Sequence, residues 1–92
     1  MKAILTYITM IKDRPVEQTR LFDTDTARKI CDVKNSFGNT VQDIYITEKG
    51  TIFLHNINKD TLEIPNQKEM KEWVGENEPD KYIEVFGEVE EG

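Results

Sequence analysis

The clearest alternation of hydrophobic and polar positions lies in residues 41–57. Two segments with a period of two, VQDIYIT and TIFLHNI, flank the short turn EKG. Four aliphatic positions share one face of the two segments: Ile44, Ile46, Ile52 and Leu54. Gly50 can supply the positive φ that a tight turn requires. The pattern predicts a β-hairpin with these aliphatic residues in the core and with Tyr45, Phe53 and His55 on the opposite face.

Three further segments are strand candidates. Residues 2–11 are rich in β-branched and aromatic residues and contain neither glycine nor proline, which predicts a strand. Because the odd-numbered and the even-numbered positions of this segment are both largely apolar, we expect a central strand or one that is buried on both faces. Residues 16–22 form a weaker candidate with poor periodicity. Residues 61–64 form a short candidate that ends at Pro65.

Residues 22–32 (FDTDTARKICD) predict a short helix in the first half of the chain. The carboxylate of Asp23 can accept a backbone N–H from the first turn and so cap the helix. Ala27, Ile30 and Cys31 follow at i, i+3 and i+4 and would share one face. The alternative for DTDT, a calcium loop, lacks the central glycine and the distal glutamate that such a loop needs.

Two more helices are predicted in the last third. Asn66 and Glu69 form a capping pair for a helix over residues 67–76. Its inward positions would be Met70, Trp73 and Val74. Pro79 suits the first position of a second helix, which Gly87 would end. The inward positions of this second helix would be Tyr82, Ile83 and Phe86.

Together these elements predict a single α+β domain over residues 1–87, followed by an acidic tail at residues 88–92. We expect a small, mostly antiparallel sheet packed with one short helix in the N-terminal half and two C-terminal helices. The apolar run at residues 3–11 is too short to span a membrane, and no cleavage site follows it. We therefore expect a cytoplasmic protein that does not associate with membranes.

Charge is distributed unevenly along the chain. Residues 69–92 contain nine acidic and two basic residues, whereas residues 1–68 contain nine acidic and ten basic residues. An acidic segment of this kind repels phosphates and favours a protein partner with a basic groove over nucleic acid. The candidate partner-binding residues are Glu69, Glu72, Glu76, Glu84, Glu88, Glu90 and Glu91. The alternative is that these carboxylates only solvate helix faces and a frayed chain end.

Candidate chemistry is sparse. One cysteine and one histidine fall short of a zinc ligand set, and EKGT carries too little glycine for a phosphate loop, so we expect no metal and no cofactor. Cys31 and His55 could form a nucleophile–base pair, which leaves an enzyme as one alternative. Basic residues in the first third leave a small DNA-binding regulator as another. They are Lys12, Arg14, Arg20, Arg28, Lys29 and Lys34.

Three stretches, in this order, resemble small and largely uncharacterised proteins of prophages and integrative elements of Gram-positive bacteria. LFDTDTA (21–27) is similar to their Phe-Asp-Thr-x-Thr-Ala opening, and YITEKGTIFLH (45–55) to their Lys-Gly-x-x-Phe-Leu hairpin. EWVGENEPDKYIEVFGEVEEG (72–92) is similar to their acidic ending. The chain departs from them at NINKDT (56–61), where a glycine-rich loop is often found. The resemblance brings no catalytic residues.

The resemblance implies an origin in a mobile element, and such elements often encode small acidic inhibitors of host nucleases. Together with the acidic C-terminal quarter, this leads us to expect a non-enzymatic protein-binding module. Its target would be a host nucleic-acid-handling defence protein, and it would act as an anti-CRISPR or antirestriction protein with a DNA-mimicking surface. Trp73, Tyr82 and Phe86 are needed first for the core, but an exposed one could anchor a partner.

Overall fold

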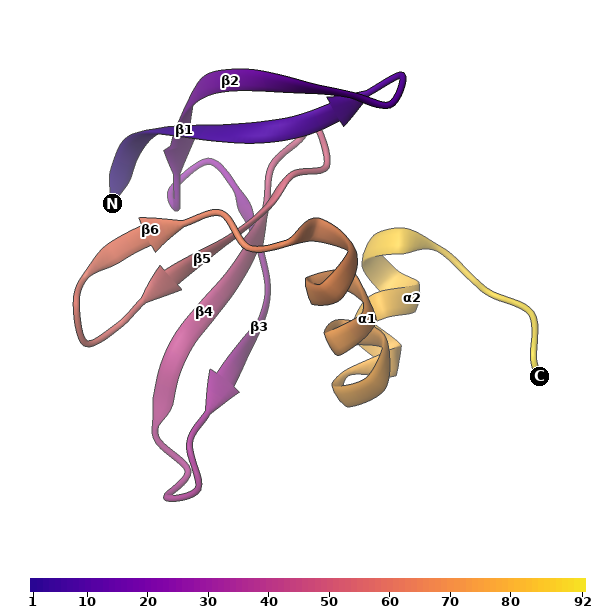
Figure 1. Cartoon of the computed structure of the whole chain (residues 1–92). Helices are drawn as coiled ribbons and strands as arrows, with labels where there is room; N and C mark the ends of the chain where they lie inside the picture. The colour runs from indigo at the N-terminus through magenta and orange to yellow at the C-terminus, as the bar shows by residue number, and fades with distance from the viewer.

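The computed structural model describes all 92 residues and contains six strands followed by two helices (Figure 1). The elements are β1 (Lys2–Ile11), β2 (Arg14–Asp23), β3 (Arg28–Lys34), β4 (Thr40–Ile46), β5 (Ile52–Asn56), β6 (Thr61–Glu63), α1 (Gln67–Asn77) and α2 (Pro79–Phe86). The strands form two antiparallel sheets, one of two strands with the order β1-β2 and one of four strands with the order β3-β4-β5-β6. The fold is therefore α+β, as expected.

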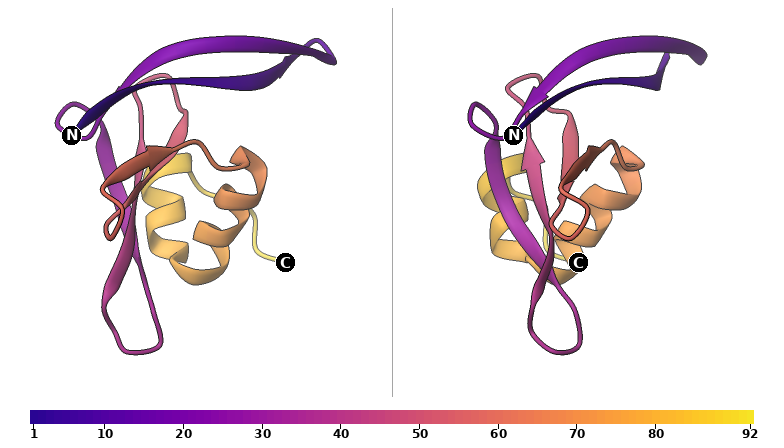
Figure 2. Two further views of the ribbon diagram at one scale, coloured as in Figure 1. Left: turned by 60° about the vertical axis from the view of Figure 1, so that its left-hand side comes forward. Right: turned by 90° about the vertical axis from the view of Figure 1, so that its left-hand side faces the viewer.

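The four-stranded sheet carries a separate apolar cluster on each face. On one face α1 and α2 cover a cluster built from Ile30, Ile44, Ile52, Leu54 and Val74. On the other face the β1–β2 hairpin contributes Phe22 to a cluster with Phe53 and Leu62. The two phenylalanine rings meet edge to face with their centroids 5.3 Å apart. The views in Figures 1 and 2 show the hairpin crossing one end of the sheet, away from the two helices.

The predicted hairpin over residues 41–57 is confirmed as β4 and β5. Ile44 pairs with Leu54 and Ile46 with Ile52, so the four aliphatic residues share the face that the helices cover. Tyr45, Phe53 and His55 lie on the other face, and the rings of Tyr45 and Phe53 stack with centroids 5.3 Å apart. Gly50 adopts a φ of 89° in the turn, as the tight connection requires.

The helix predicted over residues 22–32 is wrong. The Asp23 carboxylate does accept a backbone N–H, that of Asp25 at 2.9 Å, but this contact closes a turn before β3 rather than capping a helix. Ile30 lies at a bulge in β3, which places it and its neighbour Cys31 toward the helices. Ala27 packs on the opposite side of the sheet. The helix-like spacing of these three apolar residues therefore arises from a turn followed by a bulged strand.

The strand predicted over residues 2–11 is confirmed as β1, but the expected burial is wrong. β1 pairs only with β2, the candidate strand at residues 16–22, through a turn in which Lys12 and Asp13 both have positive φ. Its inner positions, such as Leu5 and Tyr7, pack on the second cluster. Its outer positions are exposed, so β1 is neither central nor covered on both faces.

The two C-terminal helices are confirmed with one change. The Asn66 side chain caps α1 by accepting the Glu69 N–H at 2.9 Å, and Val74 is fully buried. In α2 the residues against the first cluster are Tyr82, Val85 and Phe86, whereas Ile83 is exposed, contrary to expectation. The short strand predicted at residues 61–64 is β6. Neither helix is long and apolar enough to cross a membrane.

Candidate functional site

A stripe of carboxylates runs along one face of α1. Glu69, Glu72 and Glu76 are spaced i, i+3 and i+7, which places them within one narrow sector of the helix surface. All three side chains are exposed, and none takes part in an ion pair. These three residues are called the α1 stripe below.

The nearby cations do not neutralise the α1 stripe. The ammonium group of Lys71 lies 4.9 Å from the centroid of the Phe86 ring and 5.8 Å from that of Tyr82, so it sits over the aromatic rings of α2. Lys81 lies 3.6 Å from a carboxylate oxygen of Glu84, the next turn of its own helix. Lys68, one turn before Glu72, is exposed and forms no ion pair. None of the three carboxylates of the α1 stripe therefore lies within ion-pair distance of a cation.

The remaining predicted partner-binding residues fall into two different environments. Glu84 accepts a hydrogen bond of 2.8 Å from the guanidinium of Arg28, which ties α2 to β3, so this carboxylate already has partners in the fold. The carboxylates Glu88, Glu90 and Glu91 follow Gly87 in a segment without regular secondary structure, and all are exposed. In Figure 1 this segment leads away from the two helices. The structure thus divides the seven glutamates into a rigid stripe, one structural ion pair and a tail.

The structure does not bring Cys31 and His55 together. Cys31 lies on the face of the sheet that the helices cover, and burial raises the pKa of its thiol to about 11, with the charges of Glu78 and Asp32 adding to the effect. His55 belongs to the opposite face. Its ring nitrogen Nε2 lies 2.8 Å from Oδ1 of Asp60, across the loop that joins β5 and β6. Both residues therefore have local structural roles that do not include each other.

The basic residues of the first third do not form one patch. Arg28 pairs with Glu84, and the ammonium of Lys29 lies 3.1 Å from the mostly buried carboxylate of Asp43. This contact with Asp43 raises the pKa of Lys29, against a smaller opposing effect of burial. The others are dispersed along the fold, because Lys12 and Arg14 lie at the tip of the β1–β2 hairpin whereas Lys34 ends β3.

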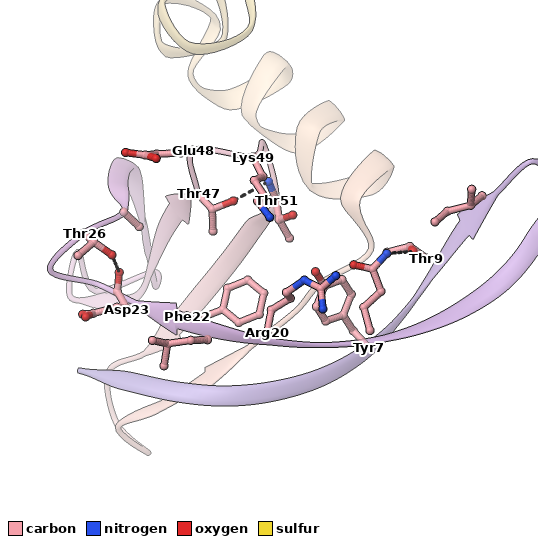
Figure 3. Close-up of a pocket in the computed structure, with 14 residues that line it drawn as sticks. Tyr7, Thr9, Arg20, Phe22, Asp23, Thr26, Thr47, Glu48, Lys49 and Thr51 are labelled. Atoms are coloured by element: carbon pink, nitrogen blue, oxygen red, sulfur yellow. Dashed lines mark hydrogen bonds between the residues drawn. The ribbon is translucent and has the colours of Figure 1, made fainter.

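A cleft of about 640 Å³ lies between the inner face of the β1–β2 hairpin and the turn that joins β4 to β5. Figure 3 shows Tyr7, Arg20 and Phe22 on the hairpin side of the cleft, facing Thr47 and Lys49 of the turn. Neither Cys31 nor His55 lines it. Sequence periodicity does not predict the cleft, because its two walls belong to hairpins that only the tertiary structure brings together.

The outer face of the β1–β2 hairpin is apolar and exposed. Four large side chains on it are exposed to 60–72%: Ile4, Ile8, Met10 and Leu21. In their midst the hydroxyls of Thr6 and Thr19, which face each other across the two strands, lie 3.0 Å apart. These six residues are called the outer hairpin face below. Folded proteins rarely leave such a contiguous apolar face without a role.

Comparisons of the chain with protein-family models, with curated proteins and with solved structures give no match.

Proposed function

We propose that this chain is a non-enzymatic protein-binding module that presents the α1 stripe to a basic groove on a partner protein. The observation that carries this proposal is the unpaired state of Glu69, Glu72 and Glu76 on one exposed face of a helix whose other face is anchored in the core. Charges held on a rigid element keep their spacing on binding, whereas charges on a tail lose conformational freedom.

The anchoring of α1 supports this choice over the tail. Val74 is fully buried beneath the helix, and the Gln67 side chain donates to the backbone carbonyl of Ile52 at 2.8 Å and accepts the Ile52 N–H at 2.7 Å. The stripe spans roughly 10 Å along the helix axis. A row of carboxylates with this rigidity can substitute for a row of phosphates in a groove that is shaped for nucleic acid, and long-range attraction would accelerate its association.

The partner class follows from this chemistry together with the resemblance to mobile-element proteins. A basic groove is the surface that nucleic-acid-handling proteins use for phosphates. We therefore assign the module as an inhibitor of a host defence protein of the restriction or CRISPR type, acting in the cytoplasm. The separation of Cys31 from His55 and the dispersal of the basic residues both favour this function over the enzyme and the DNA-binding regulator.

The first experiment captures the partner from nuclease-treated lysate of a Gram-positive host and then measures association with the purified partner. Replacing Glu69, Glu72 and Glu76 by glutamine should lower the association rate about tenfold and flatten its dependence on salt. The matched control replaces Asp13 by asparagine and Glu17 and Glu48 by glutamine, which removes three exposed charges that form no ion pairs elsewhere.

Equal association rates for the two triple variants would disprove the role of the α1 stripe. Capture that disappears after nuclease treatment would point to the DNA-binding alternative, which a duplex-binding assay on the Arg28→Ala, Lys29→Ala variant would then test. Circular dichroism of each variant verifies that the fold is retained.

A further inference from the structure

We propose that the outer hairpin face binds the same face of a second copy of this chain, forming a symmetric dimer. Two other surfaces are less suited to a partner. The cleft beside Arg20 and Lys49 is open, and both of these side chains are exposed. Phe37 is the most exposed large hydrophobic residue, but it stands alone in the β3–β4 turn. The outer hairpin face alone is both apolar and contiguous.

The strand register explains why these apolar residues share one face. In β1 the side chains at positions 4, 6, 8 and 10 point outward, while those at positions 3, 5 and 7 reach the second cluster. Ile4 pairs with Leu21 and Thr6 with Thr19, and Ile8 and Met10 continue the row toward the turn. Glu17, opposite Ile8, is the only charged residue within this part of the face.

The size of the face fits a dimer. Four large side chains exposed to this degree present apolar surface on the order of 500 Å², which is near the upper end of what monomeric proteins leave uncovered. Stacking two copies would remove roughly 1,000 Å² from water, the lower bound for a specific interface. A dimer of this kind is therefore expected to be of moderate strength and in exchange with its monomer.

The hairpin also lacks a covering layer on this side. A two-stranded hairpin is marginal by itself and gains stability by packing on other layers. The inner face supplies one such layer near Leu5 and Tyr7, but Ile11 and Val16 near the turn are exposed, so the distal half has little support. A second hairpin at the usual sheet separation of about 10 Å would supply the missing layer along the whole length.

The arrangement of the face suits a twofold axis. If the axis passes between the copies at the Thr6–Thr19 pair and runs across the strands, Ile4 of one copy lies over Ile8 of the other, and the reverse contact follows by symmetry. The same rotation places Glu17 of one copy over Leu21 of the other on β2, an edge strand of the contact, from which the carboxylate can reach solvent. The rest of the molecule offers no second apolar patch of this size, so a head-to-tail contact has no surface to use.

Electrostatics permits this contact despite the net charge of −6. Residues 1–23 contain three acidic and four basic residues, so the hairpin itself is close to neutral. The excess of acidic residues lies in α1, α2 and the tail. The two helices pack on the face of the four-stranded sheet that is opposite the hairpin, and the tail follows α2. Because the contact is apolar, the dimer should persist or strengthen as salt increases, unlike the electrostatic binding of the α1 stripe.

Sedimentation velocity of the full chain from micromolar to millimolar concentration tests the proposal. The expected result is a shift from the 10.7 kDa monomer to twice that mass, which high salt does not reverse. Ile8→Lys should weaken the dimer at least tenfold, because it places a charge inside the contact. The matched control, Phe37→Lys, makes the same change in charge at an even more exposed apolar residue outside the contact and should leave the dimer unchanged.

Isotope-filtered NOE measurements identify the surface independently of these variants. Intermolecular contacts between the methyl groups of Ile4 and Ile8 are expected. A monomer at every concentration, a dimer that both lysine variants weaken equally, or a dimer without these contacts would overturn the proposal. Capture of the α1-stripe partner by the Ile8→Lys variant separates the two proposals, because that variant leaves Glu69, Glu72 and Glu76 intact.

Discussion

At the scale of single residues, Cys31 and Glu84 show how the fold reassigns side chains that the sequence makes available. Cys31 is the only thiol, and its position against the helices makes it part of the apolar packing. Glu84 is one of nine acidic residues in the last quarter, yet it pairs with Arg28 from the first third. For both residues, a contact with another element of the fold determines the role of the side chain.

The raised pKa of the Cys31 thiol predicts how the stability of the fold changes at alkaline pH. Because burial raises the pKa of its thiol from 9.0 to about 11, the folded chain keeps a proton that the unfolded chain loses. The stability that this proton provides is complete below pH 9 and is lost as the pH rises through about 11. The free energy of unfolding should therefore decline across this range, as measured by urea denaturation at several pH values.

The control for this effect is Cys31→Ser, which removes the titrating group while keeping a similar side-chain volume. Burial also raises the pKa of Tyr45, and the contact with Asp43 raises that of Lys29, so both contribute in the same direction. The serine variant should retain a decline but a shallower one. An unchanged slope would show that Cys31 does not contribute.

At the scale of elements, short polar contacts position the helices on the sheet. The amide of Gln67, the first residue of α1, hydrogen bonds to both the N–H and the carbonyl of Ile52 in β5. Gly75 permits the close approach of α2, since a Cβ at this position would lie 3.3 Å from the ring of Tyr82. These contacts set the direction in which α1 presents its stripe.

The Gln67 bridge predicts the effect of two substitutions. Gln67→Ala leaves a partly buried N–H and carbonyl of Ile52 without their partner and should lower the free energy of unfolding by about 1–3 kcal/mol. Gln67→Glu keeps the acceptor but loses the donor, and so should also destabilise. Lys68→Ala changes the adjacent exposed residue and serves as the control. Urea unfolding that gives the same midpoint for all three variants would contradict the assigned role.

At the scale of the whole molecule, charge and apolar surface are segregated. The main cluster of exposed apolar residues lies on the outer hairpin face. Most of the negative charge lies on α1, α2 and the tail, with the four-stranded sheet between the two regions. A module built in this way can present a symmetric contact on one side and an electrostatic contact on another. The two proposals therefore concern surfaces that can be tested separately.

This segregation predicts that the α1 stripe reduces stability. Glu69 and Glu72, and Glu72 and Glu76, are like-charged neighbours on the helix, and each such pair costs roughly 0.2–0.5 kcal/mol. The double variant Glu72→Gln, Glu76→Gln removes both pairs and keeps Glu69 in the first turn of α1, where a carboxylate is favourable. This variant should thus be more stable by on the order of 0.5 kcal/mol at low salt. Added sodium chloride should narrow the difference from the unmodified chain, because it screens the repulsion.

Urea rather than guanidinium chloride is the denaturant for this measurement, since guanidinium chloride would itself screen the charges. The Asp13, Glu17 and Glu48 control variant should show a smaller gain, because extended chain separates Asp13 from Glu17 and Glu48 lies in another hairpin, so that these charges are farther apart in space. A loss of stability in the α1-stripe variant would mean that the carboxylates have structural partners. These glutamates would then stabilise the fold instead of destabilising it.

The elements that could be predicted from the sequence are those with local signals. Hydrophobic and polar residues alternate with a period of two on both sides of Gly50, and this pattern predicts the β4–β5 hairpin. The Asn66 cap, Pro79 and Gly87 predict α1 and α2. Each signal acts within a few residues through backbone conformation or a side-chain hydrogen bond to the nearby backbone. The acidic character of the last quarter is likewise a property of composition.

Tertiary structure alone decided the features that depend on distant partners. Residues 28–34 became a strand because pairing with β4 outweighed a helix-like spacing, and the bulge at Ile30 accommodated its apolar side chain. The apolar outer side of β1 remained exposed because only one face of its hairpin reaches the sheet. The partnering of each carboxylate depends on long-range contacts such as that between Arg28 and Glu84, which sequence periodicity does not encode.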